Sequence, residues 1–280
     1  MELTFSGRAR VPVHVCYDAE LMTRRNFFFS TAAAAVAGTA HAADAPGNAI
    51  IALRRIQMRN SPDNQRQRNT DYLRQHAAAM VRAGAGPMGF FSSNIAPNGP
   101  FLLLLGSYPS FAAVEQVQAK LAADAEYRKA VESFDGQPGL SYERTDSWLL
   151  RAFDGFPSVV PPPNDGKRPA RLFEVRTYES NNTSTLRKKI KMFNDGEIGA
   201  FQRAGGQPVF FGETIVGANQ PSLTYMLSYE DLAGRDKVWK AFGADPEWQK
   251  LRTTPGLSDA EIVSNISNYL VSPLAFSQIR

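Results

Sequence analysis

Cysteine and histidine are scarce in this chain, which has one cysteine and three histidines among its 280 residues. Cys16, His14 and His41 all lie within the first 42 residues, so the remainder has no cysteine and a single histidine, His76. A disulfide, a thiolate metal site and a cysteine–histidine zinc cluster are therefore excluded from residues 43–280. We predict neither a metal site nor a bound cofactor.

Long hydrophobic runs are also lacking, since a membrane-spanning helix needs about 20 strongly apolar residues. The run 27–42 is shorter and mostly alanine, and Thr-Arg-Arg-Asn-Phe at 23–27 precedes it. It ends in Ala-His-Ala, a small-x-small cleavage pattern. We predict that residues 1–42 are an over-extended start plus a twin-arginine signal peptide, and that the mature protein begins at Ala43. Such a protein is periplasmic and has no stable membrane insertion after cleavage. An alanine-rich buried helix is the alternative.

Neither sign of charge is in large excess. The formal net charge is +4 and is spread along the chain, so we expect no nucleic-acid partner. The glycine-rich stretch 83–89 follows a predicted helix instead of preceding one, which is the wrong context for a phosphate-binding loop. No nucleophile elbow or Ser-His-Asp set is present. The common nucleotide-binding and hydrolase motifs are thus missing.

What the chain does contain is an internal repeat. The segment "FFSSNIAPNGPFLLLLGSYPSFAAVEQVQAKLAADAEYRK" (90–129) aligns with "FFGETIVGANQPSLTYMLSYEDLAGRDKVWKAFGADPEWQK" (210–250) at an offset of 120–122 residues. Tyr108 then matches Tyr229. We predict a tandem duplication of two units. The units span 49–153 and 171–277, and a proline-rich linker at 154–170 joins them.

Each unit has the pattern of a strand, a helix, two strands, a helix and a strand. Residues 171–179 alternate between apolar and polar, as a strand requires. The first helix of each unit follows 3.6-residue periodicity and ends at a glycine, Gly84 or Gly205. The loops 96–100 and 217–221 separate strand-like runs, so both units contain a hairpin.

This element order is that of the split-βαβ, ferredoxin-like fold, which belongs to the α+β class. A four-stranded sheet with helices on one face needs a cover for its other face. Two copies in one chain supply that cover to each other. We therefore predict two fused ferredoxin-like βαββαβ units that form a pseudo-dimeric α/β barrel.

Three segments carry a resemblance to a known family: "FEVRTYES" (173–180), "GGQPVFFGE" (205–213) and "VWKAFGADPEWQK" (238–250). They resemble the NIPSNAP family, and the first unit is similar to a diverged version. The resemblance implies a dimeric α/β-barrel fold. It implies no reaction, because the family has no agreed catalytic residues, and related barrels include monooxygenases, haem-degrading enzymes and binding proteins.

The repeat also shows which polar residues recur at equivalent positions. Arg54 matches Arg176, and on the alternation Arg176 faces away from Phe173 and Val175, the side that we expect the helices to cover. We therefore predict that both arginines point into the barrel interior, where a guanidinium binds a small acidic organic ligand in bidentate fashion. An inter-unit salt bridge is the alternative.

The predicted ligand site is asymmetric. Glu174 and Tyr178 share the face of Arg176 and are further candidate ligand-binding residues. Ala52 and Ile56 replace them in the first unit. Any ligand site therefore differs between the two units.

Two titratable residues lie on predicted apolar helix stripes. His76 and Glu197 are equivalent, and a polar group on such a stripe needs a partner. His76 is a candidate base or haem ligand, and Glu197 is a second candidate catalytic residue. The alternative is that both lie at the edge of the stripe, hydrogen-bonded or half exposed. The run "LRKKIK" (186–191) is predicted to be a solvated face.

On function, two hypotheses stay open. The first is an exported protein that binds a small organic molecule or a partner through its barrel. The second is a cofactor-independent or haem-linked monooxygenase or isomerase that acts in a barrel pocket. Assembly into a homo-oligomer is open as well.

Overall fold

The computed structural model describes residues 47–164, 166 and 169–280. The predicted twin-arginine motif, the cleavage site and the new start at Ala43 lie outside these residues. No helix in the described part of the chain is long and apolar enough to cross a membrane.

The described chain consists of two halves with the same order of strands, and the second half contains additional short helical segments. The first half contains β1 (Ile50–Gln57), α1 (Gln65–Arg82), β2 (Met88–Ile95), β3 (Phe101–Tyr108), α2 (Phe111–Ala123), α3 (Ala125–Asp135) and β4 (Arg144–Ala152). The second contains β5 (Leu172–Glu179), α4 (Thr183–Met192), η1 (Phe193–Glu197), α5 (Ile198–Arg203), β6 (Gln207–Val216), β7 (Ser222–Tyr229), α6 (Leu232–Ala244), α7 (Pro246–Arg252), α8 (Asp259–Ile262) and β8 (Asn265–Pro273).

The eight strands close into one antiparallel barrel in the order β1-β3-β2-β8-β5-β7-β6-β4. Each half contributes four neighbouring strands, β4-β1-β3-β2 and β8-β5-β7-β6, which is the ferredoxin-like order. The pairs β2–β8 and β4–β6 join the halves, so each sheet covers the open edges of the other. The predicted α+β pseudo-dimeric barrel is confirmed.

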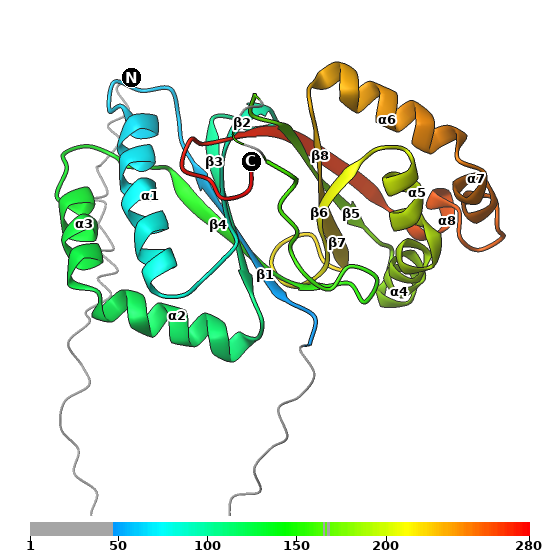
Figure 1. Ribbon diagram of the computed structural model, residues 1–280, viewed down its shortest axis with the longest axis horizontal. Helices are drawn as coiled ribbons and strands as arrows, with labels where there is room; N and C mark the ends of the chain where they lie inside the picture. Colours follow the sequence, from blue (N-terminus) through cyan, green and yellow to red (C-terminus); the bar gives the residue numbers. More distant parts are fainter. Residues whose placement is uncertain (1–46, 165, 167–168) are drawn as a thin grey trace, which may run out of the picture. The chain divides into compact units, whose positions relative to one another are not determined.

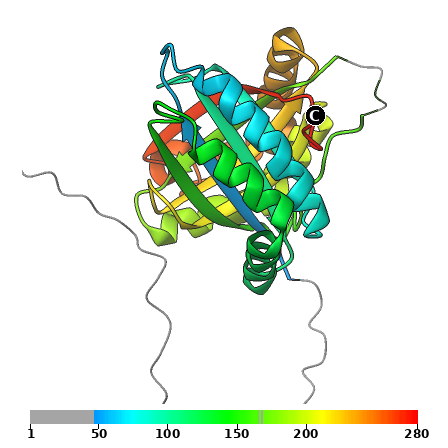
Figure 2. The same ribbon diagram turned by 90° about the vertical axis from the view of Figure 1, so that its left-hand side faces the viewer.

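The helices cover the outside of the barrel. In Figure 1, α1, α2 and α3 lie on one side of the strands, and α4 to α8 lie on the other. Figure 2 shows α1 and α3 side by side across the strands of the first half, where the hydroxyls of Tyr72 and Tyr127 are 2.7 Å apart. Each strand of the barrel therefore has one face toward the interior and one toward a helix layer.

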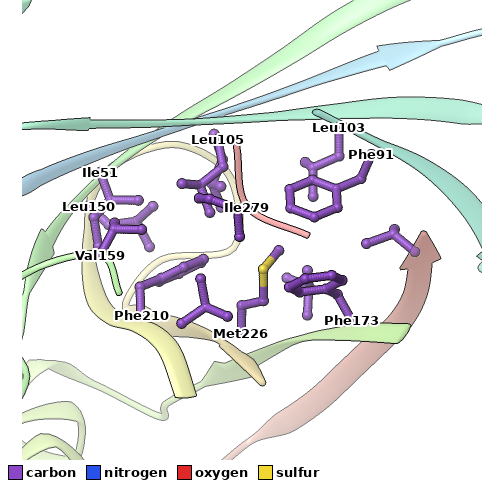
Figure 3. Close-up of a cluster of buried hydrophobic side chains, with 14 of the residues drawn as sticks. Ile51, Phe91, Leu103, Leu105, Leu150, Val159, Phe173, Phe210, Met226 and Ile279 are labelled. Carbon is purple, nitrogen blue, oxygen red and sulfur yellow. The ribbon is translucent and has the colours of Figure 1, made fainter. Parts of the chain in front are cut away.

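The barrel interior is a packed hydrophobic core. Figure 3 shows Phe91, Leu103, Phe173, Phe210 and Met226 filling the space between the two sheets. All five side chains are fully buried. The interior is thus occupied by the protein's own side chains, as close packing in cores requires.

This packing shows that one prediction was wrong. Phe173 and Val175 point into the barrel interior, so Arg176 faces the helix layer, and Arg54 of β1 does likewise. The strand alternation is as predicted, but the two faces are exchanged. The physical reason is that the middle of the interior is tightly packed between the two sheets and takes the apolar face. The helix layer is open at its margins and takes the charged one.

Helix ends follow the predicted signals. Gly84 and Gly205 adopt positive φ values of 81° and 84° just after the first helix of each half. The helical segment before the last strand is interrupted by an aspartate in both halves: α2 and α3 meet at Asp124, and α6 and α7 meet at Asp245. Asp124 accepts a hydrogen bond from the amide of Tyr127, and Asp245 accepts from the amide of Trp248.

The segment between the halves also contributes to the core. Val159 packs into the barrel cluster, and the amide of Val160 donates a hydrogen bond of 2.9 Å to the carbonyl of Val209. Ile279, near the carboxyl end, packs into the same cluster. The proline-rich segment therefore covers part of the barrel as it passes from one half to the next.

Candidate functional site

In the second half, the polar face of β5 carries a carboxylate that is completely buried. Glu174 is 0% exposed and accepts hydrogen bonds from five side chains. The donors are Arg235 at 2.8 and 2.9 Å, Arg176 at 3.0 Å, Tyr229 at 3.1 Å, Trp239 at 3.1 Å and Asn268 at 2.7 Å. We refer to these six residues as the Glu174 cluster.

The Glu174 cluster holds its carboxylate in the ionised form. Burial opposes ionisation, but the hydrogen bonds from Arg235 and the charges of Arg176 and Arg235 outweigh it and lower the pKa of Glu174 below its usual value. The carboxylate oxygens have a full set of donors. Glu174 therefore serves as an internal anion and not as a proton acceptor for a substrate.

A second buried charge pair lies deeper in the same half. The ammonium group of Lys189 is 3.1 Å from Glu197 and 3.0 Å from Asp259, and the side chains of Lys189 and Glu197 are 0% and 1% exposed. Burial raises the pKa of Glu197 to about 7 against the attraction of Lys189. Because protein encloses Glu197, a substrate has no direct access to it.

Lys189 corrects another prediction. The run 186–191 was expected to form a solvated face, yet Lys189 belongs to the buried side of α4. The signal was present in the sequence, because Lys189 lies eight residues before Glu197 and so shares its helical stripe. Two opposite charges on one apolar stripe indicate a buried pair.

In the first half, the corresponding space between sheet and helices contains a cavity of about 320 Å³. Its wall is mostly apolar and is built from β1, β2, β3, β4, α1, α2 and α3. The polar side chains in the wall are Arg54, His76, Tyr108, Gln118, Tyr127 and Ser147. This size and composition are typical of a site for a small organic molecule.

His76 is held in this wall by hydrogen bonds. Its Nδ1 is 3.0 Å from the Tyr127 hydroxyl, which in turn is 2.7 Å from the Tyr72 hydroxyl. Burial, together with the smaller effect of the positive charge of Arg54, lowers the pKa of His76 to about 4. The imidazole is therefore neutral at pH 7. Of the two candidate catalytic residues, His76 borders a cavity and Glu197 does not.

Two polar groups of the cavity lack partners of their own. Tyr108 as a residue is only 5% exposed, and its hydroxyl has no hydrogen-bond partner among the described residues. The guanidinium of Arg54 has neither an ion pair nor a hydrogen bond within that same part of the chain. The Tyr108 hydroxyl is not an enclosed atom and Arg54 is exposed, so both groups face the open cavity and are available to a ligand that enters from solvent.

A smaller cavity of about 160 Å³ lies at one end of the barrel, where Thr177, Thr224 and Tyr269 meet. Its cation, Arg55, is bound to Asp146 at 2.7 Å. Across residues 47–164, 166 and 169–280, no cluster of three or more His, Cys, Asp or Glu side chains could hold a metal ion. Of these two cavities, the one in the first half is larger and contains an arginine without an ion pair among the described residues.

The sequence analysis identified four residues of the Glu174 cluster and the cavity as candidate site residues, but it did not identify the residues that contact them. Arg54, Arg176, Glu174 and His76 were candidates, whereas Arg235 was not. Arg235, Trp239 and Asn268 lie far from Glu174 in the sequence and reach it only through the fold. Among the partners of Glu174 that the sequence did not name, only Tyr229 had a signal, which was its match with Tyr108 in the repeat.

Comparison with known proteins agrees with this architecture. The sequence profile of the NIPSNAP family matches residues 173–278, which form the second half. No curated protein matches the chain. The NIPSNAP resemblance is thus confirmed for the second half.

Solved structures show the fold over most of the chain. A protein from Lactobacillus acidophilus NCFM, described as a candidate monooxygenase, has 10% identity and a TM-score of 0.55, and the match covers 81% of this chain and 94% of that one. A protein from Fusobacterium nucleatum subsp. nucleatum with the same description has 6% identity and a TM-score of 0.52, covering 81% and 93%. A NIPSNAP-like domain protein from Burkholderia xenovorans has 22% identity and a TM-score of 0.34 over 39% of this chain and 89% of that one.

Proposed function

We propose that the protein binds a small organic molecule in the cavity between the sheet and the helices of its first half. The observation that carries this proposal is the difference between two halves of the same fold. In the second half, the Glu174 cluster fills the space over β5, while in the first half a cavity of about 320 Å³ remains over β1. A concave, mostly apolar hollow of this size with a few polar groups in its wall is the usual form of a small-molecule site.

The proposed site lies outside the barrel interior. The interior is packed by its own aromatic and aliphatic side chains, so a ligand there would have to displace them. The first-half cavity needs no such displacement. Its mostly apolar wall contributes affinity through burial, and its few polar groups orient the molecule.

Thermal unfolding of the purified protein in the presence of small organic molecules tests this site. A ligand that binds only the folded state raises the midpoint with its concentration. Val114→Phe puts a larger side chain into the cavity wall and should remove the shift. Val81→Phe makes the same change at an exposed position of α1 and should keep it. A shift that survives Val114→Phe would place the ligand elsewhere.

A second candidate function is catalysis in the same cavity, as a cofactor-independent or haem-linked monooxygenase or isomerase. The observation in its favour is the neutral His76, which Tyr127 orients at the cavity wall. A neutral imidazole can accept a proton from a bound molecule. The two solved structures described as candidate monooxygenases share the fold.

The enzymatic function predicts that His76→Gln leaves ligand binding intact and abolishes oxygen uptake or isomerisation of the bound molecule. A Soret band in the purified protein would favour the haem-linked form. Equal turnover in His76→Gln and the unmodified protein would rule out His76 as the base. The proposed twin-arginine export would place either function in the periplasm.

A further inference from the structure

We infer that the molecule bound in the first half carries a carboxylate, and that this group takes the position over Ala52 that Glu174 takes over the equivalent strand. This inference rests on the proposed function, because it names the chemical class of ligand for the same cavity. In the second half, which binds no ligand at this position, the carboxylate of Glu174 takes the place of the ligand's carboxylate.

Strand pairing places Ala52 and Glu174 at the same position. Ala52 pairs with Gly106 of β3 and Leu149 of β4. Glu174 pairs with Leu227 of β7 and Leu270 of β8, which occupy the same places in the second sheet. The correspondence therefore follows from hydrogen-bond register and not from sequence alignment alone.

Two of the groups that bind Glu174 are retained in the first half. Arg54 corresponds to Arg176, because it pairs with Leu104 and Ser147 as Arg176 pairs with Tyr225 and Asn268. Tyr108 likewise corresponds to Tyr229, since Tyr108 pairs with Ile50 as Tyr229 pairs with Leu172. In the second half both counterparts donate to Glu174. In the first half neither has a partner among the described residues.

The hydroxyl of Tyr108 lies close to the space above Ala52, which corresponds to the place of the Glu174 side chain in the second half. A Cβ atom built on Gly106 would come within 3.1 Å of this hydroxyl and 2.9 Å of the Tyr108 ring. Gly106 is the direct neighbour of Ala52 across the sheet. Glycine at this position therefore lets the Tyr108 ring lie over β3, with its donor beside the space above Ala52.

The other groups of the Glu174 cluster are replaced by smaller side chains, which accounts for the cavity. Helices α2 and α6 both have 13 residues and begin after Ser110 and Asp231. By position in these helices, Val114 replaces Arg235 and Gln118 replaces Trp239. Both replacements line the cavity. The volume that Arg235 and Trp239 fill in one half is thus open in the other.

Charge at the cavity selects for an anion. Arg54 is a cation in its wall, His76 is neutral at pH 7, and no aspartate or glutamate lines the cavity among the described residues. A guanidinium and a hydroxyl without partners bind a carboxylate through charge-assisted hydrogen bonds. With Arg235 replaced by valine, the site retains one arginine. A monocarboxylate with an apolar body matches this wall.

Paired probes test the inference. Benzoate, phenylacetate and octanoate are each compared by titration calorimetry with the corresponding amide, which has nearly the same shape and no charge. We expect at least one acid to bind at least tenfold more tightly than its amide. Arg54→Ala should weaken the acid at least tenfold and leave the amide unchanged. Arg74→Ala removes an arginine from the outer surface of α1 and should have no effect.

A grafting experiment tests the same position without a ligand. Ala52→Glu supplies an internal carboxylate, as in the second half, and should abolish acid binding. It should also raise the unfolding midpoint above that of Ala52→Gln, which adds the same bulk without charge. The gain of Ala52→Glu over Ala52→Gln should disappear when Arg54→Ala is added.

The outcomes separate this inference from the proposed function. If acids and amides bind equally and Arg54→Ala changes neither, the cavity binds organic molecules but the carboxylate assignment is overturned. If Ala52→Glu is no more stable than Ala52→Gln, it is overturned as well. If none of the six probes binds, the proposed function and the inference fail together.

Discussion

Arg54 and Arg176 occupy the same register position in equivalent strands, yet only Arg176 has a carboxylate partner within the described chain. The Arg176 guanidinium is 3.0 Å from Glu174, and the residue that corresponds to Glu174 in the first half is Ala52. The change from Glu174 to Ala52 removes the internal carboxylate, and the changes from Arg235 to Val114 and from Trp239 to Gln118 open the cavity.

Removal of the Glu174 carboxylate should leave two partly buried cations, Arg176 and Arg235, without their shared anion. We expect Glu174→Ala to destabilise the protein by about 3–5 kcal/mol, the usual cost of breaking a buried ion pair. Acetate should restore part of the lost stability in chemical denaturation, while acetamide should not. Glu179→Ala, at the end of the same strand, is the matched control and should show no acetate effect. An equal response to acetamide would contradict this account.

The buried pair of Lys189 and Glu197 should make stability depend on pH. The pKa of Glu197 is raised to about 7 in the folded protein, above its unfolded value of 4.5. Its carboxyl therefore favours folding below pH 4.5, and this contribution is lost as the pH rises through 7.

Lys189→Met removes the compensating cation, so it should destabilise the protein more at pH 8 than at pH 5, by about 3 kcal/mol at pH 8. Adding Glu197→Gln should recover most of the loss at pH 8, because no buried anion remains. Urea denaturation at both pH values measures this. Equal destabilisation at pH 5 and pH 8 would show that the pair is not coupled.

His76 should contribute a pH dependence of its own. Its pKa is about 4 in the folded protein and 6.5 when unfolded, so the unfolded chain binds the proton first. Stability should fall as the pH drops from 6.5 to 4, by about 1–3 kcal/mol at most. His76→Gln should lose this part of the pH dependence in urea denaturation between pH 7 and pH 4.5. An unchanged slope in the variant would exclude His76 as its source.

The barrel interior should be a structural core and not a ligand site. Phe173→Ala removes a fully buried ring from it and should destabilise the protein by about 3–5 kcal/mol. The affinity of folded Phe173→Ala for a ligand of the first-half cavity should stay within a factor of two or three of the original. Loss of binding in a variant that is still folded would move the site toward the interior.

Export can be tested independently of the fold. Arg24→Lys together with Arg25→Lys should keep the precursor in the cytoplasm, because the twin-arginine route depends on the arginine pair. The unmodified protein should be recovered from the periplasm with Ala43 at its amino terminus. Fractionation and amino-terminal sequencing measure both points. Normal export of the double lysine variant would exclude this route.

Much of the architecture could be predicted from the sequence. The repeat and the two periodicities determined the order of the elements, and the unfilled face of each ferredoxin-like sheet indicated a closed pseudo-dimeric barrel. These are local or one-dimensional signals. The matches of Arg54 with Arg176 and of Tyr108 with Tyr229 are one-dimensional signals as well. They identified positions that matter for the site.

The tertiary structure decided which face of each strand is inside. Alternation along β5 separates Phe173 and Val175 from Glu174 and Arg176, but it is the same whichever face points inward. In this fold both faces are covered, one by the opposite sheet and one by helices, so burial alone does not distinguish them. The arginines face the helices because apolar side chains pack the middle of the interior, whereas the helix layer is open at its margins.

The partners of Glu174 were also beyond the sequence. Arg235, Trp239 and Asn268 meet Glu174 from separate elements. The energy of a buried charge depends on distances of a few ångströms between groups far apart in the chain. The sequence by itself determined the framework and its repeated positions, and only the folded arrangement decided which half satisfies its charges and which half keeps a cavity.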